Sequence, residues 1–177
     1  MADITVSSGD YIRPHRNPYG SPEVRYMPEA PGQSFRFGDV VQQSSAASTE
    51  INQLAVASTS GSTCLSTSIV GIAAGNASSV QYTKIPFYSA NPNNEFWART
   101  RGGTLAATNV GASFGLFRHA THTNVWLVDL GNTQSTSQRV LVTELIDAVG
   151  DSGGAVAFKF GCARTAANST NTFGLGY

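Results

Sequence analysis

Short apolar segments rich in Val, Ile, Phe, Tyr and Trp recur from residue 35 onward, and clusters of Ser, Thr, Asn and Gly separate them. Segments of this length and composition, bounded by turn-forming residues, are typical of β-strands. Because no clear helical pattern lies between them, the sequence predicts an all-β fold, a single small antiparallel β-barrel or sandwich spanning residues 35–160. We expect nine strands, at residues 36–41, 53–57, 68–73, 84–90, 95–99, 114–119, 125–130, 139–142 and 155–160.

Two of the later segments allow sharper expectations. In residues 155–160 large and small side chains alternate, so Val156, Phe158 and Phe160 should face the core, while Ala155, Ala157 and Lys159 face the other way. Residues 143–149 have apolar side chains at a spacing of four, which fits either a helix or an extension of the preceding strand.

Residues 1–34 differ from the rest of the chain because they hold five of its seven prolines. Proline fixes φ and lacks a backbone donor, so this stretch should form neither a helix nor a central strand. Tyrosines and arginines are interleaved along it, which predicts an extended N-terminal arm that lies on another surface; a flexible leader is the alternative. Such an arm would be mobile in the free protein and unnecessary for folding. The candidate interface residues are Tyr11, Ile12, Arg13, Arg16, Tyr19, Arg25 and Tyr26.

The other end of the chain, residues 161–177, is polar and ends in Phe173-Gly-Leu-Gly-Tyr177, which is either loose or docks its aromatic end. The two cysteines, Cys64 and Cys162, are too few for a disulfide framework and lack the spacing of a metal site. One disulfide between them is possible, and two free thiols are the alternative expected in a reducing cytosol.

The charge and the hydropathy of the chain argue against two classes of partner, nucleic acid and membrane. Eleven basic residues balance eleven acidic ones, and the basic residues are scattered, so there is no electrostatic footprint for nucleic acid. No apolar run approaches the ~20 residues of a membrane span, and the N-terminus lacks the basic and apolar regions of a signal peptide. Hydroxyl and amide side chains dominate the polar positions, as is common in extracellular and virion β-proteins.

Residues 150–154 read Gly-Asp-Ser-Gly-Gly, the sequence around the nucleophile of chymotrypsin-like serine proteases. A serine nucleophile needs a histidine base and an orienting carboxylate. His119 and His122 are too close to Ser152 in sequence to belong to a separate barrel domain, and His15 lies in a proline-flanked polar segment. We therefore interpret the motif as a tight hairpin turn in which glycine supplies a positive φ.

No other group of residues predicts catalysis or cofactor binding. Asp39, Asp129, Asp147 and Asp151 are isolated in the sequence. His119 and His122 are three apart in a stretch expected to be strand and turn, where such positions face opposite sides. Without a third ligand, no metal site is expected, and no cofactor.

The order of the segments is also informative as a whole. The informative segments, in chain order, are Phe37-Gly38-Asp39-Val40-Val41, 69–75, 85–90, 94–98, 106–111, 125–129, 145–151 and Ala155–Phe160. Over residues 35–160 their succession resembles that of the small β-barrel head proteins of tailed bacteriophages, the decoration or cement proteins.

The resemblance implies a mechanical function. Such a protein is made in the host cytoplasm and binds the outer surface of the expanded capsid. It would bridge subunits of the major capsid protein and cluster with copies of itself, as a trimer or around quasi-three-fold positions. The alternatives are a chymotrypsin-like serine protease and a tail- or fibre-associated β-domain that binds a receptor.

Overall fold

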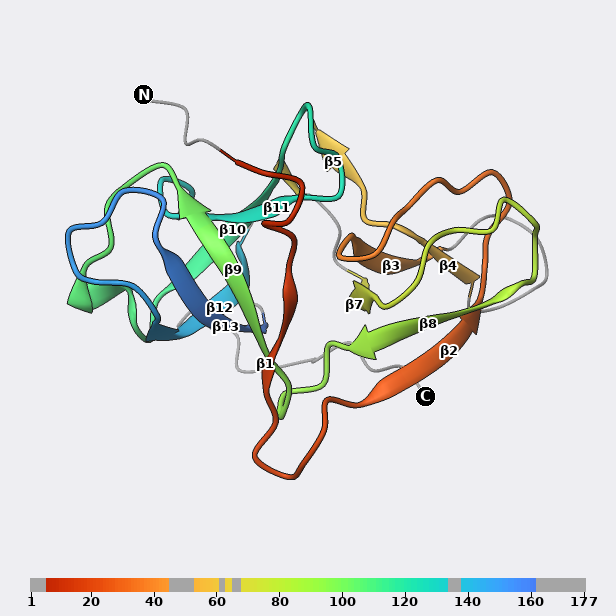
Figure 1. The fold of residues 1–177 in the computed structure, drawn as a ribbon, viewed down its shortest axis with the longest axis horizontal. Coiled ribbons are helices and arrows are strands. Elements are labelled where there is room, and N and C mark those ends of the chain that lie inside the picture. The colour runs from red at the N-terminus through yellow and green to blue at the C-terminus, as the bar shows by residue number, and fades with distance from the viewer. Residues whose placement is uncertain (1–5, 45–52, 61–62, 65–67, 134–137, 162–177) are drawn as a thin grey trace, which may run out of the picture.

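A computed structural model describes residues 6–44, 53–60, 63–64, 68–133 and 138–161. The chain is all-β, as expected, and its strands form a closed five-stranded barrel and a second sheet beside it (Figure 1). The described elements are β1 (Arg13–Arg16), β2 (Val24–Pro28), β3 (Val40–Ser44), β4 (Gln53–Val56), β5 (Thr59–Ser60), β6 (Thr63–Cys64), β7 (Ile69–Ala73), β8 (Lys84–Ser89), β9 (Glu95–Arg101), the 3₁₀ helix η1 (Ala107–Asn109), β10 (Ser113–Arg118), β11 (Trp126–Asp129), β12 (Gln138–Leu145) and β13 (Ala155–Phe160).

The barrel is built from the strands nearest the C-terminus, in the order β9-β13-β12-β10-β11. Neighbouring strands are antiparallel except at the closure, where β11 runs parallel to β9 and Val128 lies opposite Thr100. Phe96, Phe158 and Phe160 fill the interior, and the Phe96 and Phe160 rings meet edge to face at 5.2 Å. Aromatic pairs in this geometry add to the hydrophobic stabilisation of a core.

The inward face expected for β13 is confirmed, because Val156, Phe158 and Phe160 are buried. Lys159 is half-buried, with its ammonium 3.7 Å from Glu95. Ala155 and Ala157 were expected to face away from the core, yet they are also buried. The larger side chains of neighbouring strands cover them; Trp97, for example, lies opposite Ala157 in the register.

The second sheet has the order β2-β8-β7-β3-β4 and is entirely antiparallel. Proline is unusual in an inner strand because it cannot donate to the ladder. Pro86 is tolerated in β8 because it lies just beyond Ala73↔Phe87, the last registered pair with β7. One face of this sheet has its own small core, formed by Phe35, Val41, Leu54, Val70, Ala73, Ile85 and Phe87.

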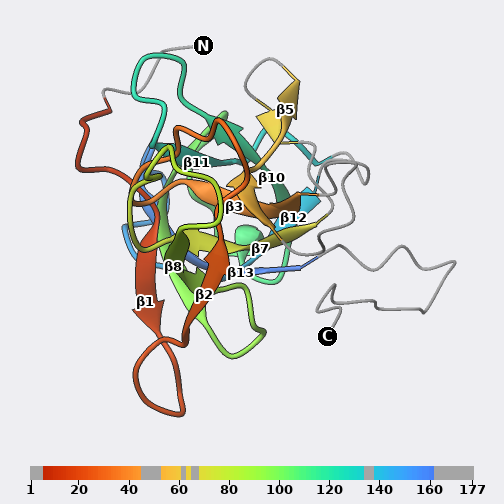
Figure 2. The ribbon, with the colours of Figure 1, turned by 90° about the vertical axis from the view of Figure 1, so that its right-hand side faces the viewer.

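The barrel and the second sheet share buried residues at their junction. Val40 and Ile72 of the second sheet belong to the core of the barrel. Figure 2 views the molecule from the side of the second sheet, with the barrel behind it. Asp39, which precedes β3, accepts a 2.8 Å hydrogen bond from the Trp126 indole of β11. The two units are therefore joined by continuous packing and by a buried polar contact.

The N-terminal segment is not a separate arm, and this corrects the sequence-based interpretation. β1 pairs with the beginning of β9, and β11 pairs with the end of β9 on the same side. β2 is an edge strand of the second sheet and pairs with β8. Ile12 is fully buried in the barrel core. The prolines do keep these strands at edges, as expected, but an edge strand is still part of the fold.

Three further expectations can be compared with the described residues. The strand expected at 36–41 begins only at Val40, because Gly38 has a φ of +88° and the Asp39 carboxylate accepts the Arg36 amide in a turn. At 143–149 the strand alternative is correct as far as Leu145. The short strands β5 and β6 were not expected. Cys64 is buried, whereas Cys162 and the tail lie outside the described residues.

Candidate protein-binding face

The Gly-Asp-Ser-Gly-Gly motif lies in the connection between the antiparallel strands β12 and β13. Gly150 has a φ of +99° and Gly153 one of +71°, the backbone role expected for glycines of a turn. The connection is longer than a tight hairpin, and two backbone hydrogen bonds hold it against Leu105, from the Gly150 amide (2.8 Å) and to the Asp151 carbonyl (2.9 Å). Ser152 is exposed.

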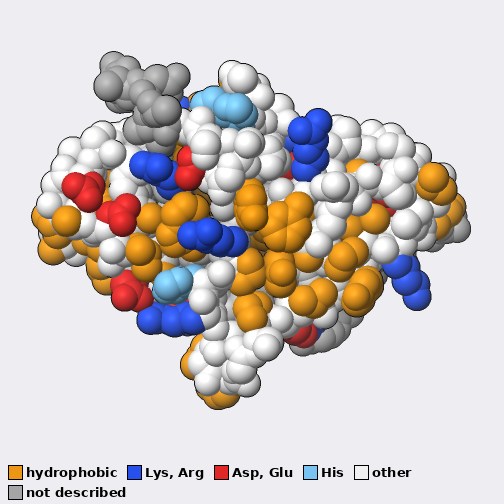
Figure 3. Space-filling model, in the orientation of Figure 1, with side chains coloured by type: hydrophobic (Ala, Val, Ile, Leu, Met, Phe, Trp, Pro, Cys, Tyr) orange, Lys and Arg blue, Asp and Glu red, His pale blue; other side chains and the backbone are white. Residues whose placement is uncertain are grey.

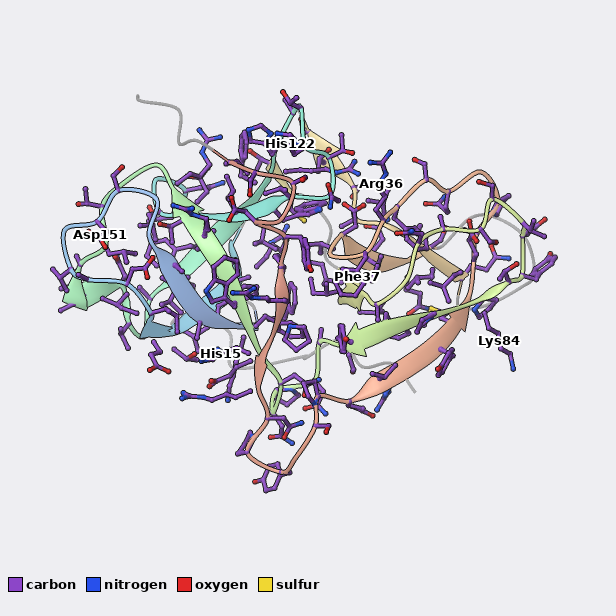
Figure 4. All side chains as sticks on the ribbon, in the orientation of Figure 1. His15, Arg36, Phe37, Lys84, His122 and Asp151 are labelled. Carbon is purple, nitrogen blue, oxygen red and sulfur yellow. The ribbon has the colours of Figure 1, made fainter. Side chains whose placement is uncertain are left out.

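Each histidine has neighbours other than Ser152. His119 accepts the amides of Thr121 and His122 at Nδ1, and its ring stacks on that of His122 with centroids 5.4 Å apart. His15 Nε2 is 4.0 Å from a Glu144 oxygen. Figure 4 shows His15 and His122 apart from Asp151, the neighbour of Ser152. Thus no serine–histidine pair is formed among the described residues.

No metal centre is formed in the described part of the chain, where no group of three or more His, Cys, Asp or Glu side chains could hold an ion. The stacked rings of His119 and His122 lie face to face, so they do not converge on a common point. The chemistry that this structure offers most clearly is instead that of a surface.

Hydrophobic side chains gather on one face of the molecule, over β1, β2 and β8 (Figure 3). Tyr11 and Phe37 meet there edge to face at 5.0 Å, and the Arg13 guanidinium lies 4.2 Å from the centre of the Trp97 ring. Arg13 is exposed, and the three rings are half-buried. We call the following set the aromatic face: Tyr11, Arg13, Val24, Tyr26, Phe37, Pro86, Tyr88 and Trp97.

Strand register explains why the second sheet contributes to this face. Val24 lies opposite Tyr88, and Tyr26 lies opposite Pro86, so the four side chains project from the same side of β2 and β8. Near the junction, glycine at position 38 lets Tyr11 approach closely, because a Cβ there would lie 2.5 Å from the Cβ of Tyr11. The face is therefore formed by both units together.

Charges beside the aromatic face are largely neutralised. Arg16 pairs with Glu95 and lies 2.9 Å from Glu144, and these carboxylates raise the pKa of the guanidinium, chiefly through the hydrogen bond to Glu95. On the other unit, the Asn91 amide and then Arg25 donate to Glu23 and lower the pKa of its carboxyl. Arg13 and Arg36 are exposed cations outside these pairs, so the surface around the aromatic side chains carries only a small excess of positive charge.

The structure separates the seven interface candidates into groups. Tyr19 and Tyr26 are exposed, by 82% and 67%, and Arg13 and Arg16 are also exposed. Tyr11 and Arg25 are half-buried. The choice of Ile12 was wrong, because this side chain is fully buried.

Trp97, Phe37 and Tyr88 were not among the candidates. The alternation of side chains in the strand at 95–99 could have identified Trp97 as an outward-facing residue, because Phe96 and Ala98 occupy the inward positions.

Asp39 is the buried polar centre behind this face. Its carboxylate accepts hydrogen bonds from the Arg36 amide (2.8 Å), the Trp126 indole (2.8 Å) and the Arg118 guanidinium (3.3 Å). Burial nevertheless dominates and raises the pKa of Asp39. Asp39 thus fixes the turn before β3 to the barrel, and so helps to position Phe37.

Comparisons of the chain with protein-family models, with curated proteins and with solved structures find no match. Within the described ranges no helix is long and apolar enough to cross a membrane. Function therefore has to be argued from the aromatic face itself.

Proposed function

We propose that this protein is a virion structural protein that decorates the outer surface of a tailed-phage capsid and bridges subunits of the major capsid protein. The observation that supports this role best is the aromatic face, which both β-units build and which carries little net charge. Aromatic side chains and arginine are enriched at protein interfaces, where charged residues are depleted from the central region. Large rigid rings such as Trp97 and Tyr26 also dominate binding energy when a partner covers them.

The edge of β2 at Val24 and Tyr26 offers a second means of attachment, whereas just beyond the strand the Ala30 amide already donates to the Leu54 carbonyl of β4. The Ser89 amide donates to the Glu23 carbonyl and the Glu29 amide donates to the Thr83 carbonyl, so these positions of the β2 segment face β8. Backbone amide and carbonyl groups alternate in direction along a strand, so those of Val24 and Tyr26 point away from β8. A strand of the partner could pair there, as in β-strand addition, while its side chains cover the neighbouring rings.

Integration of the N-terminal segment changes how attachment would work. A mobile arm would lose on the order of 1 kcal/mol of conformational free energy for each residue that binding orders. Here β1 and β2 are already paired with β9 and β8, so the aromatic face is formed before binding. Preorganisation of this kind improves affinity because less ordering is required.

Co-sedimentation of the purified protein with expanded capsids that lack it tests this proposal. Tyr26→Ser removes an exposed ring from the face and should weaken binding about tenfold or more. Its free energy of unfolding should change by less than about 0.5 kcal/mol, since the side chain is exposed. Leu141→Ser is the matched control, because Leu141 is an exposed apolar side chain of β12 outside the face. Equal binding by both variants and the wild type would contradict the proposal.

A further inference from the structure

Exposed apolar side chains also occur at the end of the barrel farthest from the second sheet. Val110, Ile146 and Val149 are exposed there, Val149 by 64%. The charged residues of the 146–154 connection are Asp147 and Asp151, both exposed. Figure 3 shows acidic side chains beside hydrophobic ones at this end, on the left of the view. We call these five residues the barrel-end patch.

A second patch lies at the opposite end of the long axis, in the loop before β8 and at the first residue of that strand. Val80 is 63% exposed and Tyr82 is 49% exposed. Lys84 is the one charged residue of segment 74–84, and it is exposed. Figure 4 places Lys84 and Asp151 at opposite ends of the molecule. We call Val80, Tyr82 and Lys84 the loop-end patch.

The loop that carries the loop-end patch is held in shape by a buried carboxylate. Glu29 is fully buried and accepts the Ser78 amide and hydroxyl and the Ser79 amide, at 2.6 to 3.1 Å. Ser79 and Tyr82 have φ values of +63° and +70°, which side chains other than glycine rarely adopt. A conformation of this kind persists only where its surroundings enforce it. Val80 and Tyr82 are therefore presented in a fixed geometry.

We infer that copies of this chain associate head to tail, with the barrel-end patch of one copy on the loop-end patch of the next. The two patches are complementary: each offers exposed apolar side chains, and the acidic residues of one would meet the basic residue of the other. Patches that differ within one chain make a heterologous contact, which closes into a ring or continues as an open chain. The contact requires no capsid, so a failure of this inference leaves the attachment proposal standing.

Sedimentation velocity and native mass spectrometry of the full chain at low salt, over a concentration series up to about 1 mM, test the contact directly. The wild type should form oligomers as concentration rises. Lys84→Asp and Asp151→Lys should each weaken association about threefold to tenfold, because an attraction becomes a repulsion. Arg36→Asp is the control for charge reversal, because Arg36 is an exposed cation outside both patches, and it should leave association unchanged.

Mixing the two variants tests whether position 84 of one copy lies opposite position 151 of another, and wild-type oligomers larger than a dimer separate a head-to-tail contact from a symmetric one. The new carboxylate of the Lys84→Asp variant meets the new ammonium of the Asp151→Lys variant, and the unchanged Lys84 and Asp151 of the two variants also meet. An equal mixture should therefore associate as the wild type does, while each variant alone does not. A wild type that stays monomeric throughout the series would overturn the inference. So would a mixture no better than its components, or an Arg36→Asp variant as weak as Lys84→Asp.

Discussion

Replacing Ile12 with alanine tests whether the N-terminal segment belongs to the folded core. Ile12 is fully buried among the residues that line the barrel. Removing its branched side chain loses apolar contacts and leaves a cavity, at a cost of about 2–5 kcal/mol. For a chain of 177 residues each kcal/mol lowers the melting temperature by about 2–4 °C. The expected decrease is therefore about 4–20 °C.

Urea unfolding followed by tryptophan fluorescence, together with thermal unfolding followed by circular dichroism, gives both quantities. Tyr19→Ala is the control, because this side chain is 82% exposed in the same N-terminal segment and should cost less than about 0.5 kcal/mol. If Ile12→Ala unfolded at the same urea concentration and temperature as Tyr19→Ala, the segment would be a detachable arm, and the packing described above would be wrong.

Three further variants test separate parts of the structure. Phe158→Ala should lower the free energy of unfolding by about 3–5 kcal/mol in urea titrations, and an unchanged midpoint would contradict the barrel core. Burial raises the pKa of Asp39 above its ordinary 3.8. The folded state therefore binds this proton more tightly than the unfolded chain, and the contribution of Asp39 to stability grows as pH falls through the window between the two pKa values. In the Asp39→Asn variant, the free energy of unfolding measured by urea titration should not show this rise across the acidic range. A pH profile identical to that of the wild type would contradict the prediction. Ser152→Ala should leave stability unchanged, and a fluorophosphonate probe should not label the wild type; stoichiometric labelling that disappears in the variant would restore the protease alternative.

The sequence identified most strands of the barrel because short segments rich in β-branched and aromatic residues are separated there by turn-forming residues. Residues 155–160 were placed correctly, since Val156, Phe158 and Phe160 fill one side of the strand. The end of β12 was ambiguous because its register with β13 shifts between Val142 and Glu144, which interrupts the two-residue period. An irregularity of this kind is set by the neighbouring strand, so the sequence of β12 alone does not reveal it.

The N-terminal segment was misinterpreted for a different physical reason. Pro14 and Pro28 weigh against strands in sequence, but an edge strand needs only half of its backbone groups for pairing, and both prolines lie at sheet edges. Nothing local distinguishes Ile12, which is buried, from Tyr11, which is half-exposed. That difference depends on β9 and on the turn at Gly38, both distant in sequence.

The binding surface was only partly accessible to sequence reasoning. Tyr26 and Arg13 were chosen from composition, and both are exposed. Phe37 and Trp97 join them through tertiary contacts, since each lies beside a residue of the N-terminal segment far away in sequence. A surface that two β-units build together cannot be located before their packing is known.

Cryo-electron microscopy of the virions whose genome encodes this chain tests the central proposal most directly. We expect density for the β-barrel and the second sheet on the outside of the expanded shell, with Tyr26 and Trp97 turned towards the major capsid protein. Density for the chain in the tail or its fibres would favour receptor binding instead. A shell that carries the chain with these two residues facing solvent would contradict the aromatic face as its means of attachment.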